Sequence, residues 1–232
     1  MAKYIRALTV TFDTGISYKE IPLFRGAVLN SMGGKANMLY HNHIGSDTFR
    51  YSYPLIQYKR IGGKAAIVCI EEGADVIGQF LSEAANSIKI GEREARCNTE
   101  RIVPAKILMQ TWKSTFSYQI YRWLPLNRAN YLKYKEAEGM IERIAILENI
   151  LKGNILSMLK GFDIYLEDEL IVKITNLSEP YLLHNKGIGL MAFNADFSCN
   201  LSIPDNIGLG KNASIGYGVT RRKKEVKQKE II

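Results

Sequence analysis

The sequence predicts an α+β protein built from two consecutive units, each with strands and helices in the order βαββαβ. Three observations predict this class. The first half alternates between segments of period two and segments of helical spacing. The second half repeats this alternation less regularly, around a long amphipathic segment at residues 129–160. The 232 residues are 47% apolar and 23% charged, which allows one large domain or two compact domains with their own cores.

The elements of the first half follow from the period of its apolar residues. They are a strand at 4–12, a helix at 21–32, strands at 53–58 and 65–70, a helix at 74–85, and strands within 88–107. Gly62 and Gly63 form the turn of a hairpin, and Gly91 and Pro104 interrupt the last segment. This is the element order of a ferredoxin-like domain.

The second half predicts a related unit. Its elements are a strand at 118–123, a helix over 129–160, a hairpin of 164–166 with 170–174, and strands at 190–201 and 216–222. Gly161 is placed to end the helix. We therefore predict tandem ferredoxin-like domains at 1–110 and 111–222, followed by a basic tail at 223–232.

The charge balance indicates a polyanionic partner. The net charge is +8, from 31 Lys and Arg against 23 Asp and Glu. Nucleic acid is the commonest such partner, because Lys and Arg displace condensed counterions from phosphates, although an anionic membrane or a merely basic surface would give the same count. No apolar leader is visible, and no apolar run approaches the roughly 18 residues that cross a bilayer. We expect a cytoplasmic protein that does not bind membranes.

The cysteines argue against a disulfide framework and against a structural zinc site. Cys69, Cys97 and Cys199 are odd in number, widely spaced and without a Cys-x-x-Cys pair. We expect three buried free thiols.

A glycine-rich stretch at 200–218 has two interpretations as a phosphate-binding element. A Walker-type loop would need Gly at position 205 and Ser or Thr at position 212, where the chain has Asp205 and Asn212. What remains is Gly-x-Gly, five residues, then a second Gly-x-Gly. This spacing would let the backbone approach an RNA strand with Lys211 reaching a phosphate, and a flexible turn between strands is the alternative.

Two histidines lie two residues apart in the predicted loop after the first helix. Imidazole titrates near neutrality, so His41 and His43 could move a proton in RNA cleavage through the 2'-OH without a metal. A metal site is the weaker alternative, because Asp47 is the only potential ligand nearby. A polar loop without chemistry is the other.

A strand follows the histidines and carries further candidates. Its alternation places Tyr51 and Tyr53 on one face, with Lys59 near its basic end. Packing on a half-exposed sheet would explain the tyrosines equally well.

Two weaker groups of candidates remain. Aromatic and cationic residues interleave as either RNA contacts or interdomain packing would require: Trp112, Tyr118, Tyr121, Arg122, Trp123 and Arg128. His184 is expected to be a surface histidine in a loop.

Two of these segments resemble the CRISPR repeat-processing endoribonucleases. The glycine-rich stretch is similar to that family's C-terminal loop, with Asn200 and Pro204 leading into Gly-Leu-Gly at 208–210 and Gly-Tyr-Gly at 216–218. The His-x-His loop followed by Tyr-Pro-Leu-Ile-Gln-Tyr-Lys at 53–59 resembles the archaeal and clostridial branch. The resemblance implies tandem ferredoxin-like folds with a C-terminal glycine-rich loop.

The resemblance also implies an activity: cleavage of CRISPR precursor RNA within each repeat, without a metal or other cofactor. A 2'-OH would attack the adjacent phosphodiester and leave 2',3'-cyclic phosphate and 5'-OH ends. His43 and His41 would transfer the protons, and Tyr51 and Lys59 would support them, with the choice of Tyr51 over Tyr53 open. RNA contacts are expected from Gly208, Gly210, Lys211, Gly216, Gly218, Arg221 and Arg222.

The expected partner is CRISPR repeat RNA, as precursor and as mature guide RNA, while a homodimer and contacts with other effector subunits stay open. The alternative function is a non-catalytic ferredoxin-like RNA-binding subunit of a CRISPR effector complex. Such a subunit would not need imidazoles clustered beside the RNA, so His41 and His43 favour the enzyme.

Overall fold

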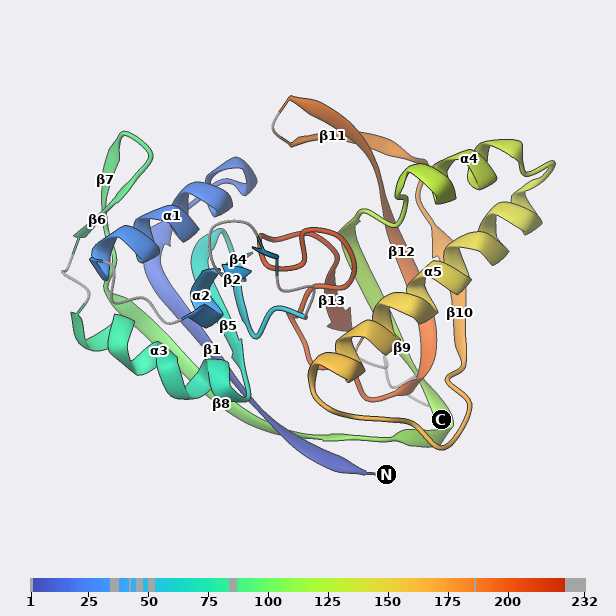
Figure 1. Cartoon of the computed structure of the whole chain (residues 1–232), viewed down its shortest axis with the longest axis horizontal. Helices are drawn as coiled ribbons and strands as arrows, with labels where there is room; N and C mark the ends of the chain where they lie inside the picture. Colours follow the sequence, from blue (N-terminus) through green and yellow to red (C-terminus); the bar gives the residue numbers. More distant parts are fainter. Residues whose placement is uncertain are drawn as a thin grey trace, which may run out of the picture.

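The protein consists of two units, each a sheet with helices on one face (Figure 1). The structure is a computed structural model that describes residues 2–33, 38–41, 43–44, 48–49, 53–83, 87–185 and 187–223. In the described part of the chain, no helix is both long enough and apolar enough to cross a membrane.

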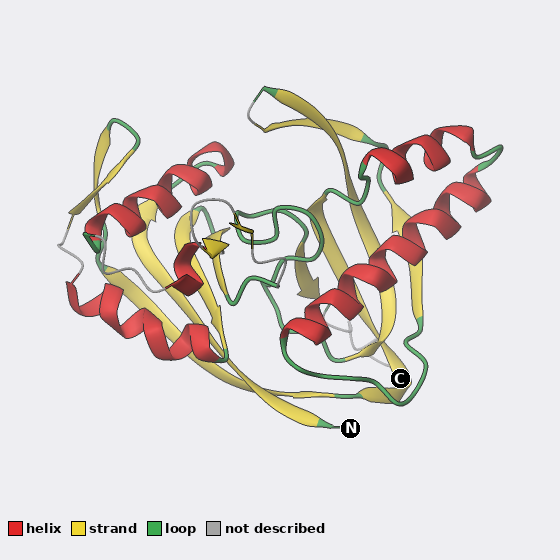
Figure 2. Ribbon diagram, viewed as in Figure 1, coloured by secondary structure: helices red, strands yellow, loops and turns green. Residues whose placement is uncertain are grey.

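The first unit has the predicted βαββαβ order. Its main elements are β1 (Lys3–Gly15), α1 (Ile21–Ser31), β4 (Ile56–Ile61), β5 (Lys64–Ile70), α3 (Glu72–Glu83) and β8 (Thr99–Met109). The antiparallel sheet has the strand order β4-β5-β1-β8. Figure 2 shows α1 and α3 against one face of this sheet.

Shorter elements decorate the first unit. They are the 3-10 turn η1 (Tyr18–Glu20), α2 (Met38–His41), β2 (His43–Ile44), β3 (Thr48–Phe49), β6 (Ser87–Ile90) and β7 (Arg93–Arg96). The strands β2 and β3 pair with each other, as do β6 and β7, which turn at Gly91. Pro104 lies inside β8 rather than ending a strand. This position tolerates proline because β8 is an edge strand.

The second unit repeats the strand order of the first. Its elements are β9 (Thr111–Trp123), α4 (Arg128–Glu136), α5 (Met140–Gly161), β10 (Val172–Leu177), β11 (Tyr181–Asn185), β12 (Ile188–Leu201) and β13 (Val219–Arg222). The sheet order is β10-β12-β9-β13, and β11 pairs with β12 as a hairpin. Residues 202–218 occupy the place that α3 takes in the first unit, and they are not helical. The prediction of tandem ferredoxin-like folds is confirmed.

The prediction of a single helix over 129–160 is wrong. The segment forms α4 and α5, which are separated at Ala137–Gly139. Gly139 is extended at φ −148° and ψ 172° and caps α5, and the Glu142 side chain accepts a hydrogen bond from Glu138 N. Leu132, Met140 and Ile141 lie near helical spacing in the sequence but are exposed, so their spacing did not report one buried helix face.

The predicted hairpin of 164–166 with 170–174 is also absent. Residues 164–166 lie outside any strand, and β10 pairs with β12 instead. Ile164 and Leu170 are buried in the same core cluster as residues of α5. Burial of these side chains therefore sets the path of the segment. His184 is exposed as expected, but it lies in β11 and not in a loop.

The β4–β5 part of the sheet of the first unit is buried on both faces. Along β5, Ile67 and Cys69 point into the core beneath α1 and α3, whereas Val68 and Ile70 join the core of the second unit. This follows from the period of two in a strand, and it explains why β5 is apolar throughout. The two units therefore share a core.

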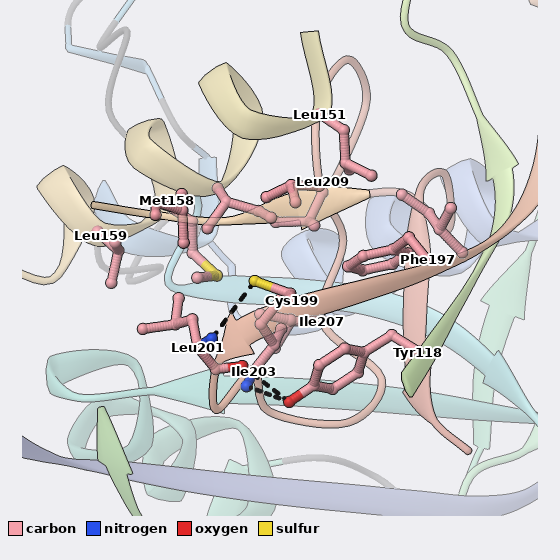
Figure 3. Close-up of a cluster of buried hydrophobic side chains, with 14 of the residues drawn as sticks. Tyr118, Leu151, Met158, Leu159, Phe197, Cys199, Leu201, Ile203, Ile207 and Leu209 are labelled. Carbon is pink, nitrogen blue, oxygen red and sulfur yellow. Dashed lines mark hydrogen bonds between the residues drawn. The ribbon is translucent and has the colours of Figure 1, made fainter. Parts of the chain in front are cut away.

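The glycine-rich segment contributes to this shared core. Figure 3 shows Ile207 and Leu209 among side chains of α5, β9 and β12. Both residues are fully buried, and each such side chain stabilises the fold by about 1.5–3 kcal/mol. Hydrophobic burial thus fixes the position of the segment. Cys69, Cys97 and Cys199 are free and buried, which confirms the prediction.

Candidate functional site

The glycine-rich segment lies beside β4, where the two units meet (Figure 1). Two main-chain contacts join them. Tyr58 N donates a 2.7 Å hydrogen bond to Ser214 O, and Tyr58 and Ile215 form an isolated parallel bridge. The first unit thereby holds a segment of the second unit more than 150 residues away in sequence.

Three side chains on one face of the 53–59 segment complete the junction. Tyr53 OH donates to Gly208 O at 2.7 Å. Gln57 Oε1 accepts from Gly208 N at 2.8 Å, and Lys59 Nζ donates to Ala213 O at 2.7 Å. Alternation along β4 places Gln57 and Lys59 on the same side, and Tyr53 precedes the strand. The glycine-rich segment covers all three side chains. The predicted common face of Tyr51 and Tyr53 stays a prediction, because Tyr51 lies outside the described residues.

Lys59 is enclosed by this arrangement. Its side chain is 0% exposed, and burial lowers the pKa of its amino group to about 7. The hydrogen bond to Ala213 O gives the amino group an acceptor in either protonation state. Burial likewise raises the pKa of the Tyr53 hydroxyl above its usual value. The side chains of Lys59 and Tyr53 therefore hold the glycine-rich segment in place.

The glycines of the segment satisfy close contacts within the protein. A Cβ at Gly208 would lie 2.5 Å from Ala213 O and 2.8 Å from Lys59 Nζ. Gly218 has φ +60°, and a Cβ there would collide with the main chain of Leu209. Gly208 and Gly218 are therefore required by the packing of the segment on itself and on β4. Their predicted contact with RNA stays a prediction.

The predicted histidine pair is located by its backbone only. His41 is the last residue of α2, and His43 opens β2 and pairs with Phe49 of β3. The side chains of His41 and His43, and the whole of Tyr51, lie outside the described residues. Their roles stay predictions.

The predicted cations of the C-terminal unit are exposed. Lys211 lies in the glycine-rich segment, and Arg221 and Arg222 lie on β13. The Arg222 guanidinium carbon lies 4.0 Å from the ring centroid of Phe116, so it is oriented by a cation–π contact. These side chains can reach a polyanion.

The interleaved aromatic residues divide between packing and the junction. Tyr118 and Trp123 are buried in the shared core, which fits the packing interpretation. Tyr121 and Arg122 instead line a small cavity together with Tyr18 and Arg60. Sequence reasoning did not single out Tyr18, which lies in no recognisable motif, and it included Arg60 only in the basic end of the strand that carries Lys59.

Both halves of the chain match one family of known proteins. Residues 3–107 match the Cas6b N-terminal domain, and residues 110–223 match the Cas6b C-terminal domain. The chain belongs to the Cas6b family. The resemblance seen in the sequence is thereby confirmed.

Known relatives agree with this assignment. A crystal structure of Cas6b has a TM-score of 0.84 at 25% identity, over 95% of this chain and 100% of the other. A crystal structure of the CRISPR RNA processing endoribonuclease Cas6b has a TM-score of 0.71 at 25% identity, over the same shares. An uncharacterized protein of Methanocaldococcus jannaschii is 37% identical over 103 residues, which are 44% of this chain and 69% of that protein.

Proposed function

We propose that this Cas6b chain is a metal-independent endoribonuclease that cleaves CRISPR precursor RNA within each repeat. The single observation that carries the proposal is the match of both halves to Cas6b domains, since a similar Cas6b structure is described as a CRISPR RNA processing endoribonuclease. The class of enzyme follows from the family. The metal-free mechanism and the residues that perform it are the further content of the proposal.

The reaction supplies its own nucleophile. One histidine removes the proton from a ribose 2'-OH while the oxygen attacks the adjacent phosphorus. The bond from phosphorus to the 5'-oxygen then breaks, and a second acid gives that oxygen its proton. The products are a 2',3'-cyclic phosphate and a 5'-OH. Proximity of the 2'-OH to the phosphate replaces the water that a metal would otherwise activate.

The position of the histidines in the sequence, shortly before β4, supports a role near the junction. His41 ends α2 and His43 begins β2 of the first unit. We assign His43 and His41 to proton transfer and Tyr51 to support of the phosphate. Lys59 acts as a positioning residue, because its amino group holds Ala213 of the glycine-rich segment.

The substrate is a repeat RNA bound along the exposed cations. The net charge of +8 and the exposed Lys211, Arg221 and Arg222 favour a polyanion. The glycine-rich segment presents Lys211 at its surface while its glycines keep the backbone close to β4. The RNA therefore contacts the second unit at the edge where its glycine-rich segment meets β4 of the first.

The decisive experiment is cleavage of labelled repeat RNA in excess EDTA. We expect the rate to be unchanged by the chelator and the products to carry 2',3'-cyclic phosphate and 5'-OH ends. An RNA with a single 2'-deoxy nucleotide 5' of the cut should bind and stay intact. Loss of cleavage in EDTA, with recovery on added Mg²⁺, would contradict the metal-free mechanism. Binding of the unmodified RNA without cleavage would favour a binding subunit.

A further inference from the structure

A small cavity lies at the junction of the two units, next to the glycine-rich segment. Its volume is about 150 Å³, and arginines and tyrosines dominate its lining: Tyr18, Arg60, Tyr121, Arg122, Gly216 and Arg221. Arg60 comes from β4, whereas Arg122 and Arg221 come from β9 and β13. The cavity therefore exists only when both units are docked.

The backbone at Arg122 is shaped to direct its side chain. β9 carries one residue more than β12 between Ile120 and Trp123, which is a β-bulge. Arg122 has φ +52°, a conformation that costs free energy for a residue with a side chain. Asn194 Oδ1 accepts from Arg122 N at 2.9 Å, and Gly218 N donates to Arg122 O at 3.1 Å. Bulges of this kind often orient side chains at functional sites.

Aromatic rings fix two of the guanidinium groups. The Arg122 guanidinium carbon lies 4.3 Å from the Tyr18 ring centroid and 5.0 Å from that of Tyr217. The Arg60 guanidinium carbon lies 5.0 Å from the Tyr18 ring, and Arg60 Nε donates to Ile16 O at 2.7 Å. Both groups are therefore ordered before any ligand arrives, which lowers the entropic cost of binding.

The cavity holds positive charge that no carboxylate of the described residues pairs with. Within the described part of the chain, no carboxylate forms an ion pair with Arg60, Arg122 or Arg221. Arg221 Nε donates to the neutral amide oxygen of Asn206 at 3.2 Å. Arg122 Nε is buried and has no hydrogen-bond acceptor among the described residues. Converging like charges and a buried donor without an acceptor both cost free energy, and an anion would relieve both.

We infer that this cavity seats one phosphate group of the RNA backbone, held by Arg60, Arg122 and Arg221. This rests on the proposed function, since it names a site for the same RNA. Guanidinium groups match the geometry of phosphate oxygens. A volume of about 150 Å³ is smaller than the roughly 300–1,000 Å³ of sites for drug-sized ligands, so it suits one phosphate rather than a nucleotide. The seated phosphate fixes the register of the RNA across both units.

The test combines protein variants with RNA neutralised at single positions. The RNA carries the 2'-deoxy block to prevent cleavage, and each version replaces one phosphate by an uncharged methylphosphonate. For the parent protein, we expect one position at which neutralisation weakens binding by at least about tenfold, the scale of a charged hydrogen bond. In Arg122→Gln, all-phosphate RNA should bind more weakly by a similar factor, and neutralisation at that same position should have little further effect.

Arg101→Gln is the matched control. Arg101 is exposed on β8, at the opposite edge of the sheet from β4, so its variant loses the same charge and should keep the parental pattern of sensitivity. Arg60→Gln is a second variant of the cavity, and thermal unfolding checks that each variant folds.

Three outcomes would separate the ideas. If neutralising each phosphate weakens binding to Arg122→Gln and Arg60→Gln by the same factor as binding to the parent, no phosphate couples to the cavity and the inferred site is wrong. The proposed RNA cleavage would not be affected by that result. If millimolar inorganic phosphate raises the Tm of the parent but not of Arg122→Gln, and no RNA position couples to Arg122, the cavity takes a free anion and the inference also fails. A parent protein that does not bind repeat RNA at all would instead contradict the proposed function.

Discussion

Substitution of His41 or His43 should separate the effect on cleavage from the effect on RNA binding most clearly. Proton transfer by a positioned side chain contributes about 10²- to 10⁴-fold to a rate. We expect His43→Ala and His41→Ala to slow single-turnover cleavage by that order, with the larger loss at His43. Repeat affinity should change by less than about tenfold, because a neutral imidazole adds little attraction for phosphate.

His184→Ala is the control for this pair. His184 is exposed on the β11–β12 hairpin and takes no part in the proposed reaction, so its variant should cleave at the parental rate. Single-turnover rates and filter-binding constants for all three variants are the measurement. Parental cleavage by both His43→Ala and His41→Ala would place the active site elsewhere.

At the same scale, the sequence singled out Tyr53 and Lys59 as candidates but did not predict their environment. Tyr53, Gln57 and Lys59 all bind the main chain of the glycine-rich segment, which the local pattern did not indicate. Lysine is rarely buried, so nothing local indicated that Lys59 is enclosed. Lys59 is enclosed because Gly208 and Ala213 pack against β4, and only the tertiary fold brings these distant residues together.

Among the elements, the glycine-rich segment is the one whose conformation depends most on single positions. Gly218 has φ +60°, and a Cβ at this position would collide with the carbonyl oxygen of Leu209. We expect Gly218→Ala to lower the free energy of unfolding by at least about 2 kcal/mol, since the strained conformation and the collision add. Urea denaturation measures this change.

Gly153→Ala gives the opposite expectation for the same chemical change. Gly153 lies within α5, and nothing lies within 4 Å of a Cβ placed there. Alanine should stabilise a helix interior by about 0.5–1 kcal/mol over glycine. Equal destabilisation by both substitutions would mean that the segment does not depend on glycine at Gly218.

The element boundaries show where the local pattern of apolar residues no longer predicts the secondary structure. Most strands and helices of the first unit were predictable from a period of two or 3.6, and β5, which is apolar throughout, was predictable as the strand after the Gly62-Gly63 turn. The break at Gly139 was not predictable, because the apolar residues on either side of it, Leu132, Met140 and Ile141, are exposed and their spacing does not mark a buried face. The pairing of β10 with β12 was also hidden, since the partner lies beyond the intervening β11 rather than across a short turn.

At the scale of the whole molecule, the two units repeat one strand order and share one hydrophobic core. The orders β4-β5-β1-β8 and β10-β12-β9-β13 place corresponding strands in corresponding positions. Val68 and Ile70 of the first unit share a cluster with Leu209 of the glycine-rich segment. The relative position of the units is therefore fixed by apolar burial, and Arg60 of the first unit lines one cavity with Arg122 and Arg221 of the second.

RNA binding by such a surface should depend steeply on salt. Each of Z phosphates contacted on single-stranded RNA contributes about −0.7 to the slope of log affinity against log salt concentration. Lys211→Ala should make the slope shallower by about 0.7, because Lys211 is exposed on the segment held at the junction. Lys89→Ala is the control, since Lys89 lies on the β6–β7 hairpin at the far side of the first unit and already faces Glu92 at 3.3 Å (Figure 1). Titrations of 2'-deoxy-blocked repeat RNA across a salt series measure all three slopes. An unchanged slope in Lys211→Ala would mean that the glycine-rich segment does not face the RNA, whereas an equal loss in Lys89→Ala would mean that charge acts through the net field of the protein rather than through contacts at the junction.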